Sequence, residues 1–344
     1  MRDGEGRNGN MAIETRERPR VSDEPQREPQ LGAHLVLQAL VREGVEVIFG
    51  YPGGAILPVY DALPYYPIHH VLVRHEQSAA FAADGYARAT GKVGVCMATS
   101  GPGATNLVTG IANAMMDSIP IVAITGQVSQ SVIGMDAFQE TDITGITLPI
   151  TKYNMVIRSV DEIGPAIQKA FYLARTGRPG PVLIDIPKDV QLAKGYLAPR
   201  QDLHLPGYRP TIVPHRRQIR RAAELIRQAK RPLILAGHGI IISGATEELV
   251  RFAERTQIPV GLTLLGISGF PASHPLCLGM VGMHGHAHAN RAIHEADLII
   301  GIGMRFDDRV TGRPSEFAPK AKIIHIDIDP AEIGKVLKTE VPVV

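Results

Sequence analysis

The feature that most constrains the fold of this chain is a regular alternation of short apolar runs with segments of helical periodicity. The apolar runs, which are typical of buried strands, fall at 46–49, 68–73, 93–98, 121–125, 181–186, 232–236, 259–262, 298–302 and 322–328. The helical segments fall at 77–89, 104–116, 164–174, 219–229, 245–255 and 287–294. Parallel strands joined by crossover helices give this pattern. We therefore predict an α/β fold with two doubly wound parallel-sheet domains.

Length, charge and cysteine content limit the function classes. A chain of 344 residues is long enough for about two domains. Its formal net charge of +2, without a basic block, gives no electrostatic footprint for nucleic acid. No apolar run approaches the roughly 20 residues that a membrane span requires. The two cysteines, Cys96 and Cys277, cannot form a disulfide framework, so we expect a reducing, cytoplasmic setting.

Composition divides the chain into four parts. Residues 1–30 carry too few apolar groups to offset the entropy of ordering, and we expect a disordered extension there. The first domain should span 31–190, a linker without strong periodicity should span 191–214, and the second domain should span 215–344. The last residues, Val341 to Val344, indicate the start of another strand. Because domains seldom end in mid-strand, we expect the chain to be truncated.

Glu76 is the first candidate functional residue. It lies in the stretch Val71–Ala89, where an apolar strand is followed by an alanine-rich helix. Ligands of open parallel sheets bind outside the carboxyl ends of the strands, so a carboxylate here can meet a cofactor. The alternative is structural, because an acidic residue in the first turn of a helix is also favoured by the helix dipole.

Two glycine-rich turns also follow strands. Gly50–Gly54 allows the backbone to approach a neighbour closely, and Ser100–Asn106 opens a helix whose N–H groups can hold an anion or a cofactor ring. The second turn is neither a P-loop nor a dinucleotide fingerprint, since it lacks Gly-Lys-Ser and has Asn106 in place of the last glycine. A purely structural strand-to-helix turn is the alternative.

The second half contains two further candidate clusters. The histidines His284, His286, His288 and His294 suggest a metal, but their spacing differs from that of zinc sites and we predict none. The segment Arg305–Arg309 alternates charges after a strand. It is either a surface ion-pair cluster or, through its arginines, a phosphate-binding site.

Several separate stretches together resemble the large, catalytic subunit of acetohydroxyacid synthase (acetolactate synthase), a family of thiamine-diphosphate enzymes. The resemblance covers nearly everything from about residue 31 onward. The matching stretches are Gly50–Pro58, Arg74–Gln77, Ala83–Gly91, Thr99–Gly110, Asp117–Gln127, Asp136–Glu140, Thr176–Val190, Gly282–Gly285 and Arg305–Gly312.

The resemblance assigns the first domain to the pyrimidine half of thiamine diphosphate. It implies that Glu76 contacts the aminopyrimidine and promotes the tautomer that activates the cofactor, with Gln127 as a second catalytic residue. The other residues expected to line the pyrimidine are Gly53, Gly54, Pro102 and Asn106. Phe138, Gln139 and Lys188 match the family's substrate channel.

The resemblance also implies that the second domain binds FAD without redox turnover. The positions expected to hold the flavin are Arg178, His284, Arg305, Asp307, Arg309 and Asp327. The family's C-terminal domain, whose Gly-Asp-Gly motif and downstream asparagine carry Mg²⁺ and the diphosphate, has no counterpart in this sequence. The chain by itself is therefore expected to be inactive.

The activity implied is the decarboxylating condensation of pyruvate with pyruvate or 2-ketobutyrate, in branched-chain amino-acid biosynthesis. A homodimer or homotetramer with a small regulatory subunit is expected. Two alternatives are a related flavin-containing thiamine-diphosphate enzyme, such as glyoxylate carboligase or pyruvate oxidase, and a non-catalytic flavin-binding module.

Overall fold

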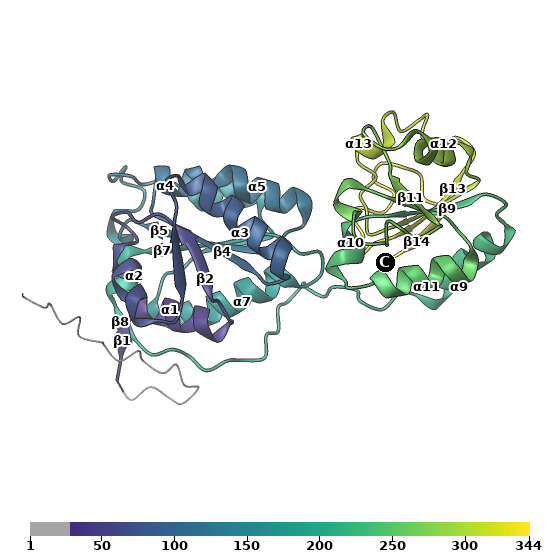
Figure 1. Ribbon diagram of the computed structural model, residues 1–344. Coiled ribbons are helices and arrows are strands. Elements are labelled where there is room, and N and C mark those ends of the chain that lie inside the picture. The colour runs from purple at the N-terminus through teal and green to yellow at the C-terminus, as the bar shows by residue number, and fades with distance from the viewer. Residues whose placement is uncertain (1–27) are drawn as a thin grey trace, which may run out of the picture. The chain divides into compact units, whose positions relative to one another are not determined.

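The computed structural model describes residues 28–344, which form two compact units that divide between His204 and Leu205. Figure 1 shows each unit as a sheet with helices on its faces. We expected residues 1–30 to be disordered, and residues 1–27 of that stretch lie outside the described residues. At its end, β1 (Gln30–Leu31) already pairs with β8 (Lys194–Gly195) in an antiparallel ladder.

The first unit is built on a six-stranded sheet in the order β3-β2-β4-β5-β7-β6, with every neighbouring pair parallel. Its strands are β2 (Val47–Gly50), β3 (His69–Leu72), β4 (Gly94–Ala98), β5 (Ile121–Gln127), β6 (Tyr153–Val156) and β7 (Val182–Pro187). The chain moves outward from β2 to β3 and then returns to add β4 on the other side of β2. The switch point of the sheet, where ligands of such folds bind, therefore lies between β2 and β4.

Helices cover both faces of this sheet (Figure 1). They are α1 (Gly32–Arg42), α2 (Leu57–Ala62), α3 (Glu76–Thr90), α4 (Pro102–Asn106), α5 (Val108–Asp117), α6 (Ile143–Thr147), α7 (Ile163–Arg175) and α8 (Lys188–Leu192). Small residues let α3 approach its neighbours. A Cβ on Gly94 would lie 2.1 Å from the carbonyl oxygen of Ala83, and one on Gly110 would lie 2.4 Å from the Ala80 Cβ. This close packing fixes the position of α3 in the unit, and with it the position of Glu76, the first residue of that helix.

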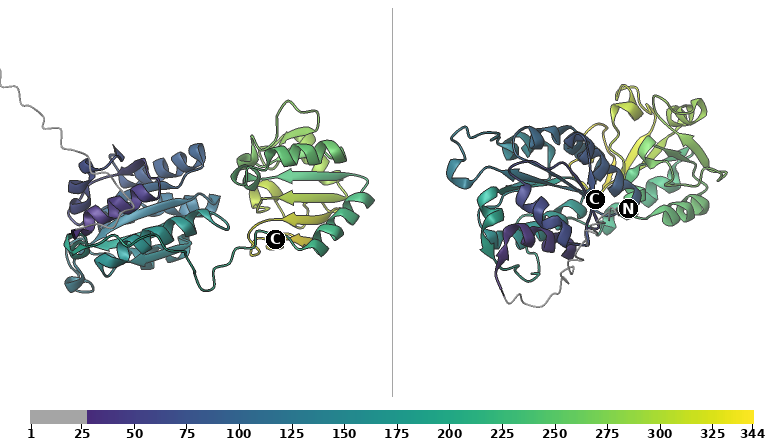
Figure 2. Two further views of the ribbon diagram at one scale, coloured as in Figure 1. Left: turned by 90° about the horizontal axis from the view of Figure 1, so that it is seen from below. Right: turned by 60° about the vertical axis from the view of Figure 1, so that its left-hand side comes forward.

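The second unit has its own parallel sheet, with helices on both faces (Figure 2). It has six strands, in the order β11-β10-β9-β12-β13-β14. The strands are β9 (Pro232–Ala236), β10 (Val260–Leu262), β11 (Cys277–Met280), β12 (Leu298–Ile302), β13 (Lys322–Ile326) and β14 (Val341–Val343). Renumbered from β9 as the first strand, the order is 3-2-1-4-5-6, as in dinucleotide-binding folds. The switch point lies between β9 and β12.

Alternating side chains of β9 fill two separate cores in the second unit. Ile234 and Ala236 pack on one face with helices α9 (Arg216–Gln228) and α11 (Thr246–Thr256), and Leu233 and Leu235 pack on the other face with α12 (Ala287–Glu295). Two short helices, α10 (His238–Ile242) and α13 (Asp308–Thr311), follow β9 and β12. Apolar residues on both faces are what a fully covered parallel sheet requires.

The predicted fold class is confirmed, and the structure differs from the predicted elements mainly at sheet edges. Strands β6 and β11, at one edge of each sheet, were not predicted. Their segments, Tyr153–Val156 and Cys277–Met280, are only partly buried, and Asn154 and Gly279 interrupt their apolar residues. The run at the end of the chain is strand β14. No helix among residues 28–344 is long and apolar enough to cross a bilayer.

The segment predicted as a linker, 191–214, is structured at its beginning. Gln191, the fourth residue of α8, is fully buried, and its side-chain amide donates to the carbonyl oxygens of Ala55 and Ile186, each at 2.8 Å. The compact first unit therefore extends past the predicted boundary at residue 190. The prediction was early because the short helix α8 shows no clear periodicity.

Candidate active site

The turns after β2 and β4 meet at the switch point of the first sheet. Thr99 lies between them: its hydroxyl accepts the N–H of Ala55 at 3.1 Å. A Cβ on Gly53 would lie 2.5 Å from the Thr99 methyl carbon, and one on Gly103 would lie 2.7 Å from the same atom. Only glycine fits these two positions. At Gly54, by contrast, a Cβ would meet nothing within 4 Å, so this side of the turn is open.

Glu76 is half-buried beside this pair of turns. It is the first residue of α3, and His75 caps the helix by accepting the N–H of Gln77 at 3.1 Å. The Nδ2 atom of Asn106 donates to Oε2 of Glu76 at 2.9 Å, and a Cβ on Gly103 would lie 3.3 Å from Oε1. Among the described residues, Asn106 is the one hydrogen-bond partner of this carboxylate. The structure thus brings Glu76, Asn106 and the glycine turns together.

Both interpretations of Glu76, as a cofactor-binding carboxylate and as a structural acid at a helix start, have support in this geometry. Its place in the first turn of α3 stabilises a negative charge through the helix dipole. Its contact with Asn106 and its closeness to Gly103, however, turn the carboxylate toward the switch point. An acidic residue that only stabilises the first turn of a helix does not require a glycine such as Gly103 next to its carboxylate.

The segment 128–141 connects β5 to α6 and carries Phe138 and Gln139. We call it the substrate loop, because the resemblance described above leads us to expect that these two residues line a substrate channel. A Cβ on Gly101 would lie 2.6 Å from the Gln139 carbonyl oxygen, so the loop packs on the turn that precedes Pro102. Gln139 has a positive φ of 58°, and the Phe138 side chain is 88% exposed. The structure therefore brings both predicted channel residues to the turn that opens α4.

Lys188 lies at the start of α8, directly after β7. Its neighbour Asp189 accepts both the backbone N–H and the side-chain amide of Gln130, each at 3.1 Å. These bonds tie the beginning of the substrate loop to the carboxyl end of β7. Lys188 consequently lies next to an anchor of the loop.

Gln127 has a different place from the one expected. Its side chain is 5% exposed, and Nε2 donates to Oδ2 of Asp185 at 2.8 Å and to the carbonyl oxygen of Thr141 at 3.0 Å, while Oε1 accepts the Val128 N–H at 2.9 Å. Both amide hydrogens are used inside the fold rather than offered to a ligand. The geometry gives no support to the expected pyrimidine contact.

Asp185 was missed by the sequence analysis. It is 1% exposed on β7, and burial raises its pKa to about 7, although hydrogen bonds from Thr125 and Gln127 oppose that change. The signal was present in the sequence, since one carboxylate interrupts the apolar strand Val182–Pro187. Its partners are 58 and 60 residues away and could not be inferred from spacing.

In the second unit, the predicted flavin residues of the carboxyl edge follow three strands. His284 follows β11, Arg305 follows β12 and Asp327 follows β13. The loops after β11 and β12 touch, because the Met283 N–H donates to the carbonyl oxygen of Arg309 at 2.7 Å. The structure therefore brings the loops that carry His284, Arg305 and Arg309 to one edge. Arg178 belongs to the first unit, where its Nε donates to the Ser118 hydroxyl at 2.8 Å.

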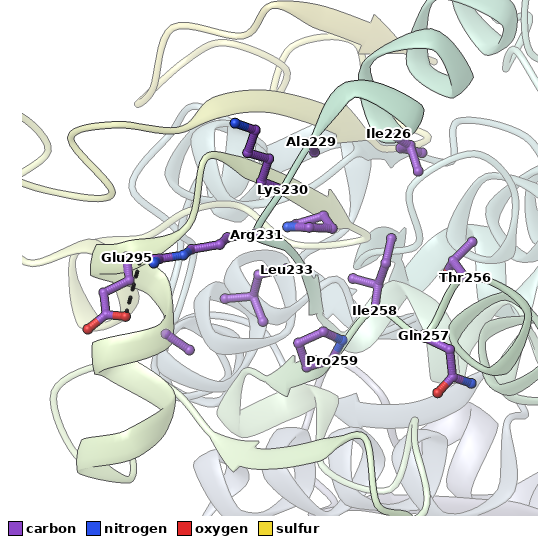
Figure 3. A pocket seen from close by; sticks show the side chains of 12 residues that line it. Ile226, Ala229, Lys230, Arg231, Leu233, Thr256, Gln257, Ile258, Pro259 and Glu295 are labelled. Carbon is purple, nitrogen blue, oxygen red and sulfur yellow. Dashed lines mark ion pairs between the residues drawn. The ribbon is translucent and has the colours of Figure 1, made fainter.

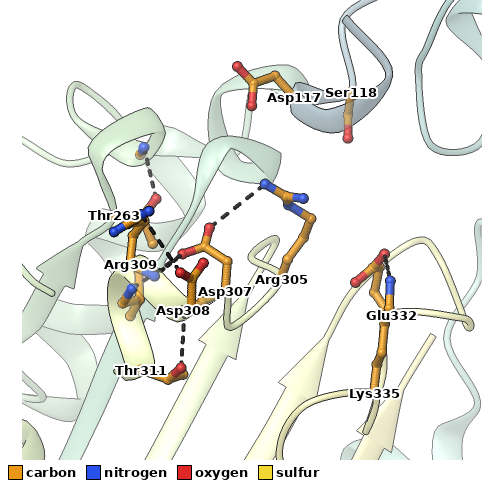
Figure 4. Close-up of polar contacts among 12 residues, drawn as sticks. Asp117, Ser118, Thr263, Arg305, Asp307, Asp308, Arg309, Thr311, Glu332 and Lys335 are labelled. Carbon is orange, nitrogen blue, oxygen red and sulfur yellow. Dashed lines mark hydrogen bonds and ion pairs between the residues drawn. The ribbon is translucent and has the colours of Figure 1, made fainter. Parts of the chain in front are cut away.

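The charges of this edge pair largely with one another (Figure 4). Asp307 caps α13 by accepting the N–H groups of Arg309 and Val310 at 3.0 and 3.2 Å. Arg305 Nη2 lies 3.7 Å from Asp307 Oδ2, and Arg309 Nε lies 3.8 Å from Asp308 Oδ2. The ion-pair alternative for this segment thus has direct support, while the Arg305 side chain stays 29% exposed and within reach of a ligand.

His325 was also missed by the sequence analysis. It is buried on β13, and its Nε2 donates to the Met304 carbonyl oxygen at 2.8 Å. Burial lowers its pKa, against the opposing effects of that hydrogen bond and of the acidic groups Asp327 and Glu332. Through its bond to the Met304 carbonyl oxygen, His325 therefore holds the turn that carries Arg305.

A pocket of about 540 Å³ opens at the amino ends of β9 and β10 (Figure 3). Apolar side chains such as Leu233 and Ile258 line it, and Arg231 and Glu295 form an ion pair of 3.7 Å at its rim. Ligands of parallel sheets bind at the opposite, carboxyl edge. None of the predicted site residues lines this pocket.

No group of three or more His, Cys, Asp or Glu side chains within residues 28–344 could hold a metal ion. The rings of His286 and His288 stack with centroids 5.3 Å apart, and the Nε2 of His288 bonds to the Leu278 carbonyl oxygen at 2.9 Å. The histidine cluster thus has contacts of its own.

Comparison with protein families accounts for both sheets. Residues 31–146 match the N-terminal thiamine pyrophosphate-binding domain of thiamine pyrophosphate enzymes, and residues 219–344 match the central domain of the same enzymes. The chain belongs to the thiamine pyrophosphate enzymes. Within the N-terminal domain of this family lie the switch-point turns, Glu76 and Asn106.

Several relatives among the thiamine pyrophosphate enzymes are similar over nine-tenths of this chain. A "probable acetolactate synthase large subunit" of Methanocaldococcus jannaschii is 58% identical over 317 residues, which are 91% of this chain and 54% of the relative. The acetolactate synthase large subunit of Corynebacterium glutamicum is 56% identical over 320 residues, 92% of this chain and 51% of the relative. The acetolactate synthase large subunit of Mycobacterium tuberculosis is 57% identical over 314 residues, which are 91% of this chain and 51% of the relative. The chain spans about half the length of these relatives.

Proposed function

We propose that this chain is part of the catalytic subunit of an acetolactate synthase, which condenses pyruvate with a second 2-keto acid and releases carbon dioxide. The observation that carries the proposal is the half-buried carboxylate of Glu76, held by Asn106 beside two close-packed glycine turns at the switch point of a parallel sheet. The relatives named above carry that activity in their names.

The residues present fit the pyrimidine half of thiamine diphosphate. Gly54 faces open space. Because Gly53 and Gly103 have no side chain, the backbone packs closely on Thr99 and leaves room for a flat ring to approach. Glu76 offers a carboxylate oxygen as a hydrogen-bond acceptor, and Pro102 opens α4 beside it. When bound, thiamine diphosphate supplies the electron sink for decarboxylation.

The chain's own residues have three tasks in this proposal. Glu76 holds or releases a proton at Oε1 while Asn106 fixes Oε2 and thereby the direction of the carboxylate. Phe138 and Gln139 present an apolar and a polar contact to the keto acid, and Lys188 offers it a positive charge. The substrate loop, packed on Gly101, limits access of water from one side.

We propose FAD as the ligand of the second unit. Its strand order is that of dinucleotide-binding folds, and Arg305, His284 and Asp327 lie at the carboxyl edge. The donor set is suitable, because a partly exposed guanidinium matches a phosphate or a flavin edge. Asp307, Arg309 and Arg178 belong to the proposal as surrounding residues, each with a partner inside the chain. Mg²⁺ would be bound by residues outside this chain.

The assembly and location follow the same proposal. We expect a homodimer or homotetramer and a small regulatory subunit, in keeping with the word "large" in the relatives' names. The free cysteines Cys96 and Cys277 fit the reducing cytoplasm. A glyoxylate carboligase, a pyruvate oxidase or a non-catalytic flavin module is not favoured, since these relatives are named acetolactate synthases.

The test is product analysis with the complete protein. Pyruvate alone and pyruvate with 2-ketobutyrate are supplied together with thiamine diphosphate, Mg²⁺ and FAD. Acetolactate and acetohydroxybutyrate are the expected products. Tartronate semialdehyde from glyoxylate, or acetyl phosphate and peroxide from pyruvate, would assign the protein to another reaction.

A further inference from the structure

A buried polar network joins β5 to β7 below the carboxyl edge of the first sheet. Asp185 on β7 is paired in register with Thr125 on β5, and the Thr125 hydroxyl donates to Oδ1 at 2.7 Å. Gln127, two residues further along β5, donates to Oδ2 at 2.8 Å. Both oxygens of this buried carboxylate are therefore engaged, as burial of such a group requires.

The Gln127 amide connects this network to both ends of the substrate loop. Its oxygen accepts the N–H of Val128, where the loop begins, at 2.9 Å. Its nitrogen uses one hydrogen for Asp185 and the other for the carbonyl oxygen of Thr141, where the loop ends, at 3.0 Å. One side chain thus closes the loop, and Asp185 fixes which way that amide faces.

We propose that Asp185 and Gln127 are positioning residues that clamp the two ends of the substrate loop and so present Phe138 and Gln139 beside Pro102. The inference rests on the proposed function in one respect, namely that the loop contacts the keto acid. It changes the role of Gln127 from a contact with the cofactor to a support for substrate binding.

A carboxyl group suits this task better than other side chains. Two oxygens accept from two donors on the neighbouring strand, which fixes the rotamer of Gln127 without a counter-ion. Burial and the nearby acidic Asp142, which caps α6, raise the pKa of Asp185 to about 7. The protonated form can keep the clamp as well, because the Thr125 hydroxyl can turn to accept its proton.

Hydrogen–deuterium exchange of the complete protein tests the clamp without substrate or cofactor. Gln127→Met and Asp185→Ala should raise exchange about tenfold at the loop amides next to the clamp, above all that of Val128, which donates to Gln127 Oε1. This is the change expected when a buried hydrogen bond is lost. Exchange in β4 and α5 should stay unchanged. Asp185→Asn, which keeps an acceptor for Gln127 and a donor for Thr125, should restore protection of the loop.

Thr151→Val is the matched control. It also removes one buried hydroxyl, which donates to the Thr147 carbonyl oxygen at 2.9 Å, but it leaves the clamp intact. Loop exchange in this variant should equal that of the wild type. Equal loop exchange in Asp185→Ala and Thr151→Val would overturn the proposal, as would a uniform rise over the whole first unit.

Kinetics separate the clamp from general damage to the fold. Gln127→Met and Asp185→Ala should raise KM for pyruvate about tenfold, while kcat and the Kd of thiamine diphosphate change less than about twofold. A fall in kcat with unchanged KM would return Gln127 to the catalytic centre and refute the clamp. If the wild-type protein binds no thiamine diphosphate, the proposed function fails, whereas the exchange measurement still decides the clamp.

Discussion

The two sheets of this chain satisfy the charges at their carboxyl edges in opposite ways. In the first unit, the Glu76 carboxylate has a neutral partner, Asn106, and an open glycine turn beside it. In the second unit, Asp307 caps a helix and pairs with Arg305, and Arg309 pairs with Asp308. A parallel sheet places polar residues at one edge in both cases, but the Glu76 carboxylate has no positive partner among the described residues, whereas Asp307 and Asp308 each pair with an arginine.

This difference indicates where chemistry and where binding should be sought. A carboxylate held by an amide can exchange a proton with a ligand at little structural cost. Ion pairs that already satisfy each other must be rearranged before they bind a ligand, and exposed pairs contribute little stability. The first edge is therefore suited to catalysis, and the second edge is suited to binding a ligand that does not react.

The largest effect is expected from Glu76→Gln in the complete protein. An amide can occupy the same space and still bond to Asn106, but it cannot exchange a proton, so the rate of acetolactate formation should fall about 100- to 10,000-fold. Exchange of deuterium at the thiazolium carbon of the cofactor should slow by a similar factor. Thermal stability should change little.

Glu46→Gln is the control for that substitution, since Glu46 forms an exposed ion pair with Lys92 at 2.8 Å. Its rate should match the wild type. Unchanged exchange in Glu76→Gln would remove Glu76 from the mechanism and make the two edges equivalent.

Much of this comparison could be predicted from the sequence. Continuous apolar runs give the central strands, because both faces of such strands are covered and their side chains must be mostly apolar. The place of Glu76 follows from the same rule, because it lies among the first polar residues after β3. Glycine turns after β2 and β4 indicated a close approach of the backbone, and the packing of Gly53 and Gly103 on Thr99 explains it.

The remaining features depend on which strands are neighbours. Asp185 bonds to Gln127 because β7 lies next to β5, although β6 comes between them in the chain. Periodicity does not encode this order, so the inward orientation of Gln127 could not be predicted. His325 was hidden for a related reason: its partner, the Met304 carbonyl, belongs to the turn after the adjacent strand β12.

These two buried groups provide the next prediction, a pH dependence of opposite sign in the two units. The pKa of Asp185 is raised to about 7, so its protonated form is favoured in the folded state. Its contribution is fully present below the unfolded pKa near 4 and is lost as the pH rises to about 7, by an amount on the order of 2–4 kcal/mol. Asp185→Asn should remove that loss, measured as native-state hydrogen exchange in β5 and β7 from pH 4 to 8.

His325 should behave in the reverse direction. Burial lowers its pKa, so its contribution is present above the unfolded value near 6.5 and is lost as the pH falls through the lower, folded value. His325→Gln retains a donor for the Met304 carbonyl and should abolish the acid sensitivity of β12 and β13. If both units responded to pH with the same sign, the assignment of these two groups would be wrong.

A smaller effect is expected from Arg305→Ala, which tests whether the second edge binds the flavin. Loss of one charged hydrogen bond should weaken FAD by about 1.5–3 kcal/mol, read from flavin fluorescence during titration. The affinity for thiamine diphosphate should stay the same. The control is Arg313→Ala, because Arg313 forms an exposed pair with Glu316 at 3.1 Å. Equal weakening of both cofactors would indicate general unfolding instead.

The smallest expected effect separates the two roles open to Asp307. Asp307→Ala removes the cap of α13 and should destabilise the second unit by about 1 kcal/mol, seen as faster exchange of the Arg309 and Val310 amides. Asp308→Ala, which removes the adjacent acid but not the cap, should leave those amides unchanged.

Flavin affinity then decides what the cap is for. If Asp307 only caps the helix, FAD should bind the Asp307→Ala protein almost as well as the wild type, because the loss of the Arg305 ion pair, which is 3.7 Å long, leaves the guanidinium available for the ligand. A fall in affinity as large as that of Arg305→Ala would instead make Asp307 part of the flavin contact. The second edge would then resemble the first, with a carboxylate that serves its ligand directly.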